Sequence, residues 1–568
     1  MKLPTLKIVA ACLLALSLTS LAKELKTTEP AQAAHGKHGI VASVHPTATE
    51  AGINALKRGG NAIDAAVAVA LTLGVVDGDN SGIGGGCFML IHRANGSVVA
   101  IDGREMAPAA ATRDMFIRDG KGDTELSQVG ALASGVPGAL AAYDYAVKNY
   151  GKKKLKDLLL PAAKIAQDGF KLNASYAGRL KGSARDMKRF QSSRAVFFKS
   201  DGQPLGEGDT LKQPDLAATY RHIAEQGSDW FYHGPFGIAV ETWMKKNGGI
   251  MTAKDLDNYH ICLREPITTS YRDYQTITFP PPSSGGVHVT EMLNILEHFN
   301  LKSLDEPTRL HVIAETMKLA FADRAYWLGD PDFVKVPHGL VDKKYAAELA
   351  AKINLDHTIE VTSHGMPADW QTNVFKKHTT HFSVADAEGN WVACTATVNT
   401  SFGSKVVIPG TGVVMNNEMD DFSTQPGVAN FFKLVGAEAN AVAPGKRPLS
   451  SMSPTIILKD GKPILALGAA GGPTIISQVL LSLVNILDLG MPPEMAIAQP
   501  RIHHQWSPNE LSVEKALAPA LKANLEKRGH HLSEKGGIGV TQIVGRDRDG
   551  KNFVGVADPR AGGKAAGW

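Results

Sequence analysis

The stretch HTTHFSVADAEGNWVACTATVN, residues 378–399, predicts two β-strands joined by a tight turn. Before the turn at residues 386–390 (DAEGN), side chains alternate between two faces with a period of two. After the turn, apolar or small side chains occupy the even positions from 392 to 398, and threonines occupy 395 and 397. This period is typical of strands with one buried face. The stretch therefore predicts an antiparallel hairpin.

Pairing the apolar faces of this hairpin places odd positions opposite odd positions. One allowed register puts Thr397 opposite Thr379 and Thr395 opposite His381, with Asn399 diagonally near Thr379. Opposed residues have Cβ atoms about 4.5–5.5 Å apart, so the two threonine hydroxyls at 379 and 397 could share a hydrogen bond. An ordinary amphipathic hairpin with threonines of high β propensity fits the same pattern, and the pattern alone favours that simpler interpretation.

The bulk composition predicts a large core and excludes some functions. The chain has 568 residues, of which 43% are hydrophobic and 20% charged, and its formal net charge is +4. This length suggests more than one folding unit, and the near-neutral balance argues against nucleic acid or a polybasic membrane surface as partner. Beyond the leader only Cys87, Cys262 and Cys394 remain, which is no disulfide framework; buried small hydrophobes are the simplest interpretation.

The N-terminus predicts a secretory signal peptide. Lys2 and Lys7 flank the start of an apolar run at residues 8–21, and residues 20–22 (SLA) offer a small-residue cleavage site. The run is short for a retained membrane helix, and no other stretch is long enough to span. We therefore expect a signal peptide at residues 1–22, no stable membrane insertion, and a periplasmic or secreted mature protein.

The remaining sequence predicts helices and strands in a layered arrangement. Residues 62–76 form an expected buried helix, with Asn61 as N-cap and Asp64 completing a capping box. Pro161 is expected to start another helix, and residues 411–416 to form a strand. Two sheets packed between helical layers would account for these expected helices and strands. The polar residues 356–377 are expected to form a linker before the hairpin.

Several motifs, in their order and spacing, resemble the γ-glutamyltranspeptidase family. Each motif alone is moderately specific, whereas the set is very specific and covers essentially the whole mature chain. The motifs are residues 59–66 (GGNAIDAA), 104–108 (REMAP), 379–384 (TTHFSV), 397–403 (TVNTSFG), 416–422 (NNEMDDF), 446–454 (KRPLSSMSP) and 558–560 (DPR).

The resemblance implies an N-terminal-nucleophile hydrolase fold, an α/β (α+β) αββα sandwich. Its two stacked antiparallel sheets lie between helical layers and are formed jointly by two chains after self-cleavage. The cut would fall between His378 and Thr379, giving a large subunit of residues 23–378 and a small catalytic subunit of residues 379–568. The freed α-amine, whose ordinary pKa is about 7.7–8.0, suits the role of base for the Thr379 hydroxyl. Thr380 is the rival nucleophile. It shares its strand face with Phe382 and Val384 and should point into the core, and the motif spacing of the family also favours Thr379.

The resemblance also implies a site for the free amino acid end of a γ-glutamyl group. Arg104 would bind the α-carboxylate with help from Ser450 and Ser451, and arginine suits this because its planar fork meets a carboxylate bidentately. Asp421 would bind the α-ammonium. Without the resemblance, a surface ion pair with Asp102 or Glu105 is the better explanation of Arg104, and a solvated acidic turn the better explanation of Asp421. The expected helpers of Asp421 are Asn399 and Glu418.

Two further features complete the implied site. The backbone N–H groups of Gly471 and Gly472 would form the oxyanion hole before a helix at 474–487, although a glycine pair there is usually a plain turn. Residues 426–436 resemble a lid loop, in which Phe432 stands where many members carry tyrosine. Phe432 can exclude water but cannot donate a hydroxyl bond.

The sequence thus predicts a self-processing γ-glutamyltranspeptidase that acts on glutathione and related γ-glutamyl compounds. A γ-glutamyl-threonine ester would pass its acyl group to water or to amino acid or dipeptide acceptors. No cofactor and no metal is expected, because histidines such as His503 and His504 lack metal-ligand spacing. Two alternatives stay open: an acylase of the same fold acting on glutaryl, cephalosporin-type or poly-γ-glutamate amides, and an uncleaved periplasmic binding protein.

Overall fold

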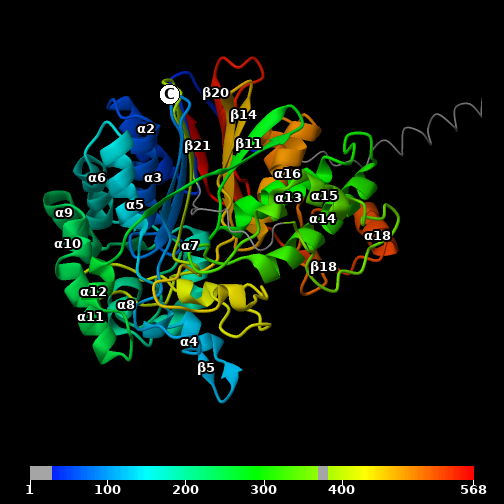
Figure 1. Cartoon of the computed structure of the whole chain (residues 1–568). Helices are drawn as coiled ribbons and strands as arrows, with labels where there is room; N and C mark the ends of the chain where they lie inside the picture. The colour runs from blue at the N-terminus through cyan, green and yellow to red at the C-terminus, as the bar shows by residue number, and fades with distance from the viewer. Residues whose placement is uncertain (1–28, 369–381) are drawn as a thin grey trace, which may run out of the picture.

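The computed structural model of the chain describes residues 29–368 and 382–568 (Figure 1). The predicted signal peptide and the predicted cut between His378 and Thr379 lie outside the described residues. The two largest sheets of the described part have seven strands each, and neighbouring strands in both are antiparallel.

One of these sheets contains the predicted hairpin, and we call it the hairpin sheet. Its strands are, in spatial order, β21 (Lys564–Gly567), β2 (Gly39–Ser43), β12 (Ser383–Asp386), β13 (Trp391–Thr397), β3 (Gly86–His92), β4 (Val98–Gly103) and β9 (Cys262–Arg264). The hairpin β12–β13 lies near the centre of this sheet, so it is paired on both sides. It is flanked by β2 and β3, both from the N-terminal part of the chain, while the C-terminal strand β21 forms one edge of the sheet.

The other sheet, which we call the facing sheet, stacks on the hairpin sheet. Its strands are, in spatial order, β1 (Ala33–Gly36), β20 (Phe553–Ala557), β19 (Val540–Arg546), β15 (Lys462–Ala470), β14 (Thr455–Lys459), β11 (Tyr274–Thr278) and β10 (Ile267–Tyr271). A core of buried side chains fills the space between the sheets and includes Phe88, Trp391, Phe279, Ile456 and Val544. The stacked strands are visible in the middle of Figure 1.

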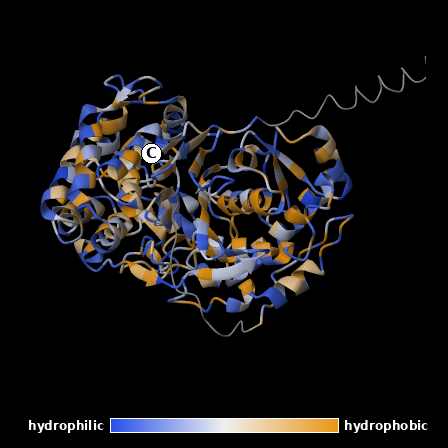
Figure 2. Cartoon of the chain, turned by 90° about the horizontal axis from the view of Figure 1, so that it is seen from above, coloured by the Kyte–Doolittle hydropathy of each residue, from blue (hydrophilic) through white to orange (hydrophobic). Residues whose placement is uncertain are grey.

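Helices cover the outer face of each sheet. The hairpin-sheet side carries α2 (Pro46–Lys57), α3 (Ala62–Val76), α5 (Ala139–Tyr150), α6 (Leu155–Asp168) and α9 (Pro214–Gln226). The facing-sheet side carries α13 (Ser284–Leu296), α14 (Glu306–Trp327), α15 (Lys343–Ala350), α16 (Thr474–Leu483), α17 (Pro493–Ala498) and α18 (Pro519–Lys527). Two apolar cores, one under each helical layer, complete the predicted αββα sandwich. Coloured by hydropathy, the molecule shows apolar residues inside both halves (Figure 2).

The remaining α-helices and strands of the described residues lie outside the two large sheets and the helices named above. The helices are α4 (Thr124–Gln128), α7 (Ala174–Met187), α8 (Gln191–Phe197), α10 (Asp229–Tyr232), α11 (Pro235–Lys246) and α12 (Ala253–Asp257). The strands are β5 (Ile117–Arg118), β6 (Lys121–Gly122), β7 (Phe170–Lys171), β8 (Thr210–Leu211), β16 (Ile502–His504), β17 (Leu511–Glu514) and β18 (Leu532–Lys535).

The hairpin has the predicted register wherever it is described. Ser383 pairs with Ala393, and Ala385 pairs with Trp391, which is the alignment that places position 397 opposite position 379. The alternation indicated one buried face, but both faces of the hairpin are buried. Even positions pack under α3, whereas odd positions such as Trp391 are buried between the two sheets. A central strand of a four-layer sandwich has no exposed face.

The predicted N-cap and capping box of α3 are confirmed. Asn61 caps α3 by accepting from the backbone of Ile63 and Asp64, and Asp64 accepts from the Asn61 N–H.

The prediction that Pro161 starts a helix was wrong. Pro161 lies inside α6, which begins at Leu155. Pro161 is exposed there, where water can satisfy the carbonyl that lost its donor, while the opposite helix face is buried.

Two other expectations need correction. Residues 411–416 contain no strand, only an isolated bridge between Val407 and Val414. The three cysteines of the described residues are free as expected, but only Cys87 and Cys394 are buried; Cys262 is half-buried, with its Sγ 3.6 Å from the Arg447 guanidinium.

Candidate active site

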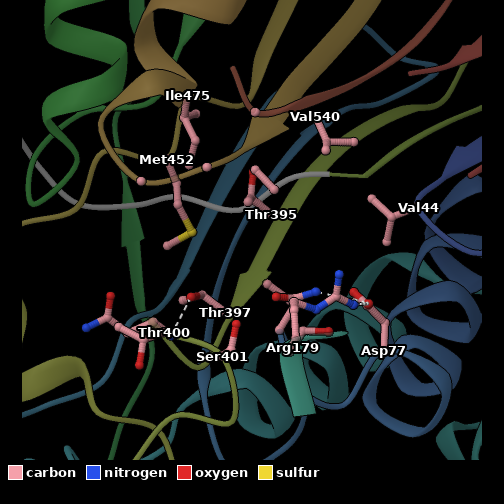
Figure 3. A pocket seen from close by; sticks show the side chains of 18 of the residues that line it. Val44, Asp77, Arg179, Thr395, Thr397, Thr400, Ser401, Met452, Ile475 and Val540 are labelled. Carbon is pink, nitrogen blue, oxygen red and sulfur yellow. Dashed lines mark hydrogen bonds and ion pairs between the residues drawn. The ribbon is translucent and has the colours of Figure 1, made fainter. Parts of the chain in front are cut away.

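A cavity of about 700 Å³ gathers the predicted site residues. Every one of them that the structure describes lines this cavity: Arg104, Thr397, Asn399, Glu418, Asp421, Phe432, Ser450, Ser451, Gly471 and Gly472. Phe382, where the described chain resumes, also lines it. In the close view, Met452 and Ile475 lie on one side of the cavity and Arg179 and Asp77 on the other (Figure 3).

The end of β13 presents two of the predicted residues to the cavity. Thr397 is the last residue of the strand, and its hydroxyl accepts a hydrogen bond of 2.7 Å from the Asn399 N–H. Asn399 has φ +75°, and its side-chain amide donates to the Asn417 carbonyl at 2.9 Å. Asparagine tolerates this left-handed conformation better than most residues. The two hydrogen bonds of Asn399 therefore fix the turn that follows β13 and hold the Thr397 hydroxyl in place.

Arg104 is held rigidly at one end of the cavity. Its side chain is 1% exposed, and its guanidinium contacts Glu418 at 2.6 Å and Asp421 at 2.6 Å. It also donates from Nε to the Pro448 carbonyl at 3.1 Å. The residue predicted to bind a carboxylate thus pairs with the two residues predicted to bind an ammonium. A zwitterionic substrate could exchange partners with this cluster without leaving a buried charge unpaired.

The cluster holds more acids than bases. Glu105 lies 3.6 Å from the same guanidinium, and burial raises its pKa to about 8 despite the opposing charge of Arg104. Burial also raises the pKa of Glu418 well above its usual value, although Arg104 opposes that shift. One guanidinium cannot neutralise three carboxylates, so the cluster retains protons at neutral pH. An incoming ammonium would supply the missing positive charge, so the cluster favours a cationic ligand.

Ser450 and Ser451 are positioned by groups that sequence reasoning missed. The Arg324 guanidinium, from α14, donates to the Ser451 hydroxyl at 3.1 Å and to the Ser284 hydroxyl at 2.9 Å. Ser284 donates from its hydroxyl to the Ser450 carbonyl at 2.7 Å. Burial lowers the pKa of Arg324 to about 10, which still leaves it charged at neutral pH. No local signal distinguished Arg324 from the other charged residues of α14.

The glycine pair forms the turn from β15 into α16. Gly471 has φ +136° and Gly472 φ +59°, conformations that favour glycine. A Cβ at Gly472 would lie 2.6 Å from the Phe432 ring, so a side chain is excluded there. Among the described residues, neither glycine N–H donates a hydrogen bond to another group. Both N–H groups border the cavity and are available to a ligand oxygen.

The predicted lid is an ordered hairpin over the glycine pair. Ala429 bridges Val435, and the Asn430 side chain accepts from the N–H groups of Phe432 and Leu434 at 3.0 and 3.1 Å. The Phe432 ring packs on Gly472 and meets Phe431 edge-on at 5.2 Å. The lid therefore closes this side of the cavity with apolar rings rather than with a phenol.

Asp420 ties the lid to the floor of the cavity. Its carboxylate accepts from the Phe431 N–H at 3.2 Å and from the Ser127 hydroxyl at 2.6 Å. Burial raises the pKa of Asp420 to about 6. Because the folded pKa lies above the ordinary value, the folded state takes up this proton first as pH falls. Ionising Asp420 therefore costs folding free energy above pH 6, whereas protonating it weakens the lid bond below pH 6.

We expect Asp420→Asn to remove a pH dependence of substrate binding. A hydrogen bond to a charged acceptor contributes about 1 kcal/mol more than a neutral one, so KM of the parent enzyme should rise about five-fold below pH 6. The asparagine can keep the Phe431 bond because the Ser127 hydroxyl can accept instead of donating. Its KM should stay flat when measured with a chromogenic amide substrate from pH 5 to pH 7. Parallel KM profiles for both proteins would contradict the assignment.

Comparison with known proteins identifies the family. The family model described as Gamma-glutamyltranspeptidase matches residues 48–568. The chain belongs to the γ-glutamyltranspeptidase family. It is 46% identical over 532 residues to the glutathione hydrolase proenzyme of Escherichia coli K12, an alignment that covers 92% of this chain and 91% of the relative. Proteins named acylases are also among the matches.

Solved structures support the same fold for this γ-glutamyltranspeptidase family member. The structure of cephalosporin acylase from Bacillus halodurans aligns with TM-score 0.86 and 29% identity, covering 96% of this chain and 98% of that one. The Helicobacter pylori γ-glutamyltranspeptidase structure aligns with TM-score 0.55 and 40% identity, covering 59% of this chain and 95% of that one. Within residues 29–368 and 382–568, no helix combines the length and apolar character needed to cross a membrane.

Proposed function

We propose that this protein is a self-processing γ-glutamyltranspeptidase that hydrolyses or transfers the γ-glutamyl group of glutathione and related compounds. In the precursor, the Thr379 hydroxyl attacks the His378 carbonyl carbon, and the peptide C–N bond breaks as the C–O bond forms. The Thr379 nitrogen takes up the proton that the hydroxyl loses and becomes an amine, and water then hydrolyses the ester. The products are residues 23–378 with a new carboxylate and residues 379–568 with a free α-amine.

In the mature enzyme, that amine takes the hydroxyl proton while the Thr379 oxygen attacks the substrate's γ-carbonyl carbon. The N–H groups of Gly471 and Gly472 stabilise the developing oxyanion, and the Thr397 hydroxyl positions the nucleophile. The C–N bond breaks, and the leaving amine takes the proton. Water, an amino acid or a dipeptide then attacks the γ-glutamyl ester. Three findings support this scheme: the hairpin register, the free glycine amides and the position of Phe382 in the cavity wall.

The contact that best supports the γ-glutamyl assignment is Arg104 between Glu418 and Asp421. A γ-glutamyl group carries both a carboxylate and an ammonium, so it can satisfy both signs of this cluster. A glutaryl side chain has the carboxylate but no ammonium, and it would leave the displaced acids without a cation. The balance of charges therefore favours the transpeptidase over an acylase of the same fold.

Comparing two chromogenic amides tests this assignment. We expect kcat/KM for γ-glutamyl-4-nitroanilide to exceed that for glutaryl-4-nitroanilide by at least 10-fold, and by about 100-fold where the ammonium makes a full charge-assisted bond. The two substrates share the leaving group, so the ratio isolates the α-ammonium. Equal turnover, or a preference for the glutaryl amide, would favour the acylase. A protein that stays uncut and inactive on both would be the binding protein.

We further propose that residues 1–22 direct export and are removed, so that the enzyme works in the periplasm or outside the cell. The proenzyme name of the Escherichia coli relative supports a two-subunit product. The expected partners are the two fragments of one precursor and small-molecule substrates. Nothing in this scheme uses a cofactor.

A further inference from the structure

Residues 354–368, which we call the arm, precede the proposed cut and run along α14. Most of the arm is exposed to solvent and contains no helix or strand. Its backbone is nevertheless bonded to buried side chains of α14. His311 bonds the Asn354 carbonyl at 2.8 Å. Glu315 accepts from the Ile359 N–H at 2.8 Å, and Lys318 donates to the Ile359 carbonyl at 3.1 Å.

A second anchor holds the arm at Gly365. The Asp323 carboxylate accepts from the Gly365 N–H at 2.5 Å, and the Trp327 indole donates to the Gly365 carbonyl at 3.2 Å. The Tyr345 hydroxyl holds Asp323 from the other side at 2.6 Å. A Cβ at Gly365 would lie 2.0 Å from that hydroxyl, so only glycine lets the arm come this close.

The arm also contacts the part of the chain that would become the small subunit. Thr358 donates from its N–H to the Arg528 carbonyl at 2.8 Å, and the Trp506 indole donates to the Val361 carbonyl at 2.8 Å. The arm therefore lies between α14 and the segment around α18, on the same side of the sandwich (Figure 1). It connects both future fragments upstream of the cut.

Metal binding does not explain this polar network. His311, Glu315 and His530 are close enough to hold an ion. However, the two imidazoles are bonded directly to each other at 2.7 Å, and the Lys318 ammonium lies 2.7 Å from Glu315. An ammonium at that distance opposes a second cation. These donors and acceptors already satisfy one another and the arm backbone.

Stability alone is also a poor explanation for the network. Glu315, Lys318 and Asp323 are fully or almost fully buried in α14. Replacing such buried charges by apolar residues is often neutral or stabilising, so they need another reason to be there. These three side chains share one property: each forms a hydrogen bond with the backbone of the arm, at Ile359 or at Gly365. The face of α14 that carries these side chains therefore fixes the path of the arm, which leads to the proposed cut.

We propose that Glu315 and Asp323 are positioning residues for self-cleavage, which fix the arm at Ile359 and Gly365 and keep it attached after the cut. This inference rests on the proposed self-processing. With the anchors, residues 366–381 bridge two fixed points, which is 16 residues. Without Asp323, the nearest upstream anchor is the Trp506 bond to the Val361 carbonyl, so the bridge begins at 362 and has 20 residues. The added length alone lowers the closure probability about 1.4-fold, and the loss of the arm's orientation adds to this.

Gly365→Ala tests the anchor directly. The methyl group must push the arm away from Tyr345, so the precursor should mature more slowly in a time course on denaturing gels, by at least the ~1.4-fold that the longer bridge costs. Once cut, its kcat and KM per active site should equal those of the parent protein, because the arm lies upstream of the catalytic groups. Gly178→Ala is the matched control, since a Cβ there meets nothing within 4 Å.

A second pair of variants guards against a general packing defect. Tyr345→Phe removes the hydroxyl that holds Asp323, whereas Tyr271→Phe removes an equal bond of 2.6 Å to Asp488, which bonds Tyr271 and Arg272, both outside the arm. Only Tyr345→Phe should delay maturation. Normal maturation of both Gly365→Ala and Tyr345→Phe would overturn the inference, as would a parallel loss of mature kcat and Tm. If the parent protein itself never cuts, the proposed function fails instead.

Discussion

Replacing Thr379 by alanine should leave a single uncut chain without transferase or hydrolase activity. The change removes the hydroxyl that attacks the His378 carbonyl, and without the cut no α-amine exists to act as base. Losing both the nucleophile and its activation should cost at least about 10⁴-fold in rate. On a denaturing gel the alanine variant should run as one band, while the parent protein gives two. N-terminal sequencing of the smaller parent fragment should begin at Thr379.

Two further variants make the Thr379 experiment specific. Thr379→Ser keeps both a hydroxyl and a future amine, so it should cut and turn over, only more slowly. Thr395→Val removes a hydroxyl from the same cavity wall, but the Thr395 hydroxyl has no partner among the described residues, so its loss should change little. An alanine variant at 379 that matures at the parent rate would contradict the mechanism, as would a small fragment that starts at any other position.

Features that depend on neighbouring residues could be predicted from the sequence. The cap of α3 was confirmed because Asn61 and Asp64 satisfy backbone groups within one helical turn. The register of β12 with β13 was confirmed because a short turn allows few alternatives. The family resemblance added the residues that line the cavity. Pro161 was misplaced because burial of the opposite face of α6 outweighs the cost of a proline.

Features that depend on distant contacts could not be predicted in this way. Arg104 and Asp421 are 317 positions apart, and no local pattern says that their side chains meet. Arg324 and Asp323 look like ordinary charged residues of a helix until the fold buries them under Ser451 and Gly365. The burial of both faces of the hairpin could not be predicted for the same reason. Which face of a strand is exposed depends on whether a second sheet covers it.

The second large effect is expected from Arg104→Gln, which should lower both stability and substrate affinity. Arg104 is the buried counter-charge of Glu418 and Asp421, with Glu105 close by. Removing one partner of a buried ion pair costs about 3–5 kcal/mol, because the remaining charge stays desolvated. KM for γ-glutamyl-4-nitroanilide should also rise about 100-fold, since the substrate carboxylate loses its bidentate partner. Thermal unfolding and steady-state kinetics measure the two effects separately.

The pH dependence of Arg104→Gln gives the sharper test, because its sign follows from the same cluster. Burial already raises the pKa of Glu105 to about 8 and that of Glu418 well above its usual value. Without the guanidinium both pKa values rise further, so the folded variant still holds these protons above pH 8, and its stability should fall more steeply than that of the parent protein as pH rises beyond 8. Adding Glu418→Gln should recover part of the lost stability but not the KM.

A matched control shows that burial, rather than the loss of an arginine, causes the effect. Arg113 also pairs with two acids, Asp114 and Glu438, but its side chain is 42% exposed. Arg113→Gln should therefore change stability by less than about 1 kcal/mol and leave KM unchanged. If Arg104→Gln behaves like Arg113→Gln, Arg104 is not the counter-charge of a buried acid cluster. The assignment of that cluster to a zwitterionic γ-glutamyl group would then lose its physical basis.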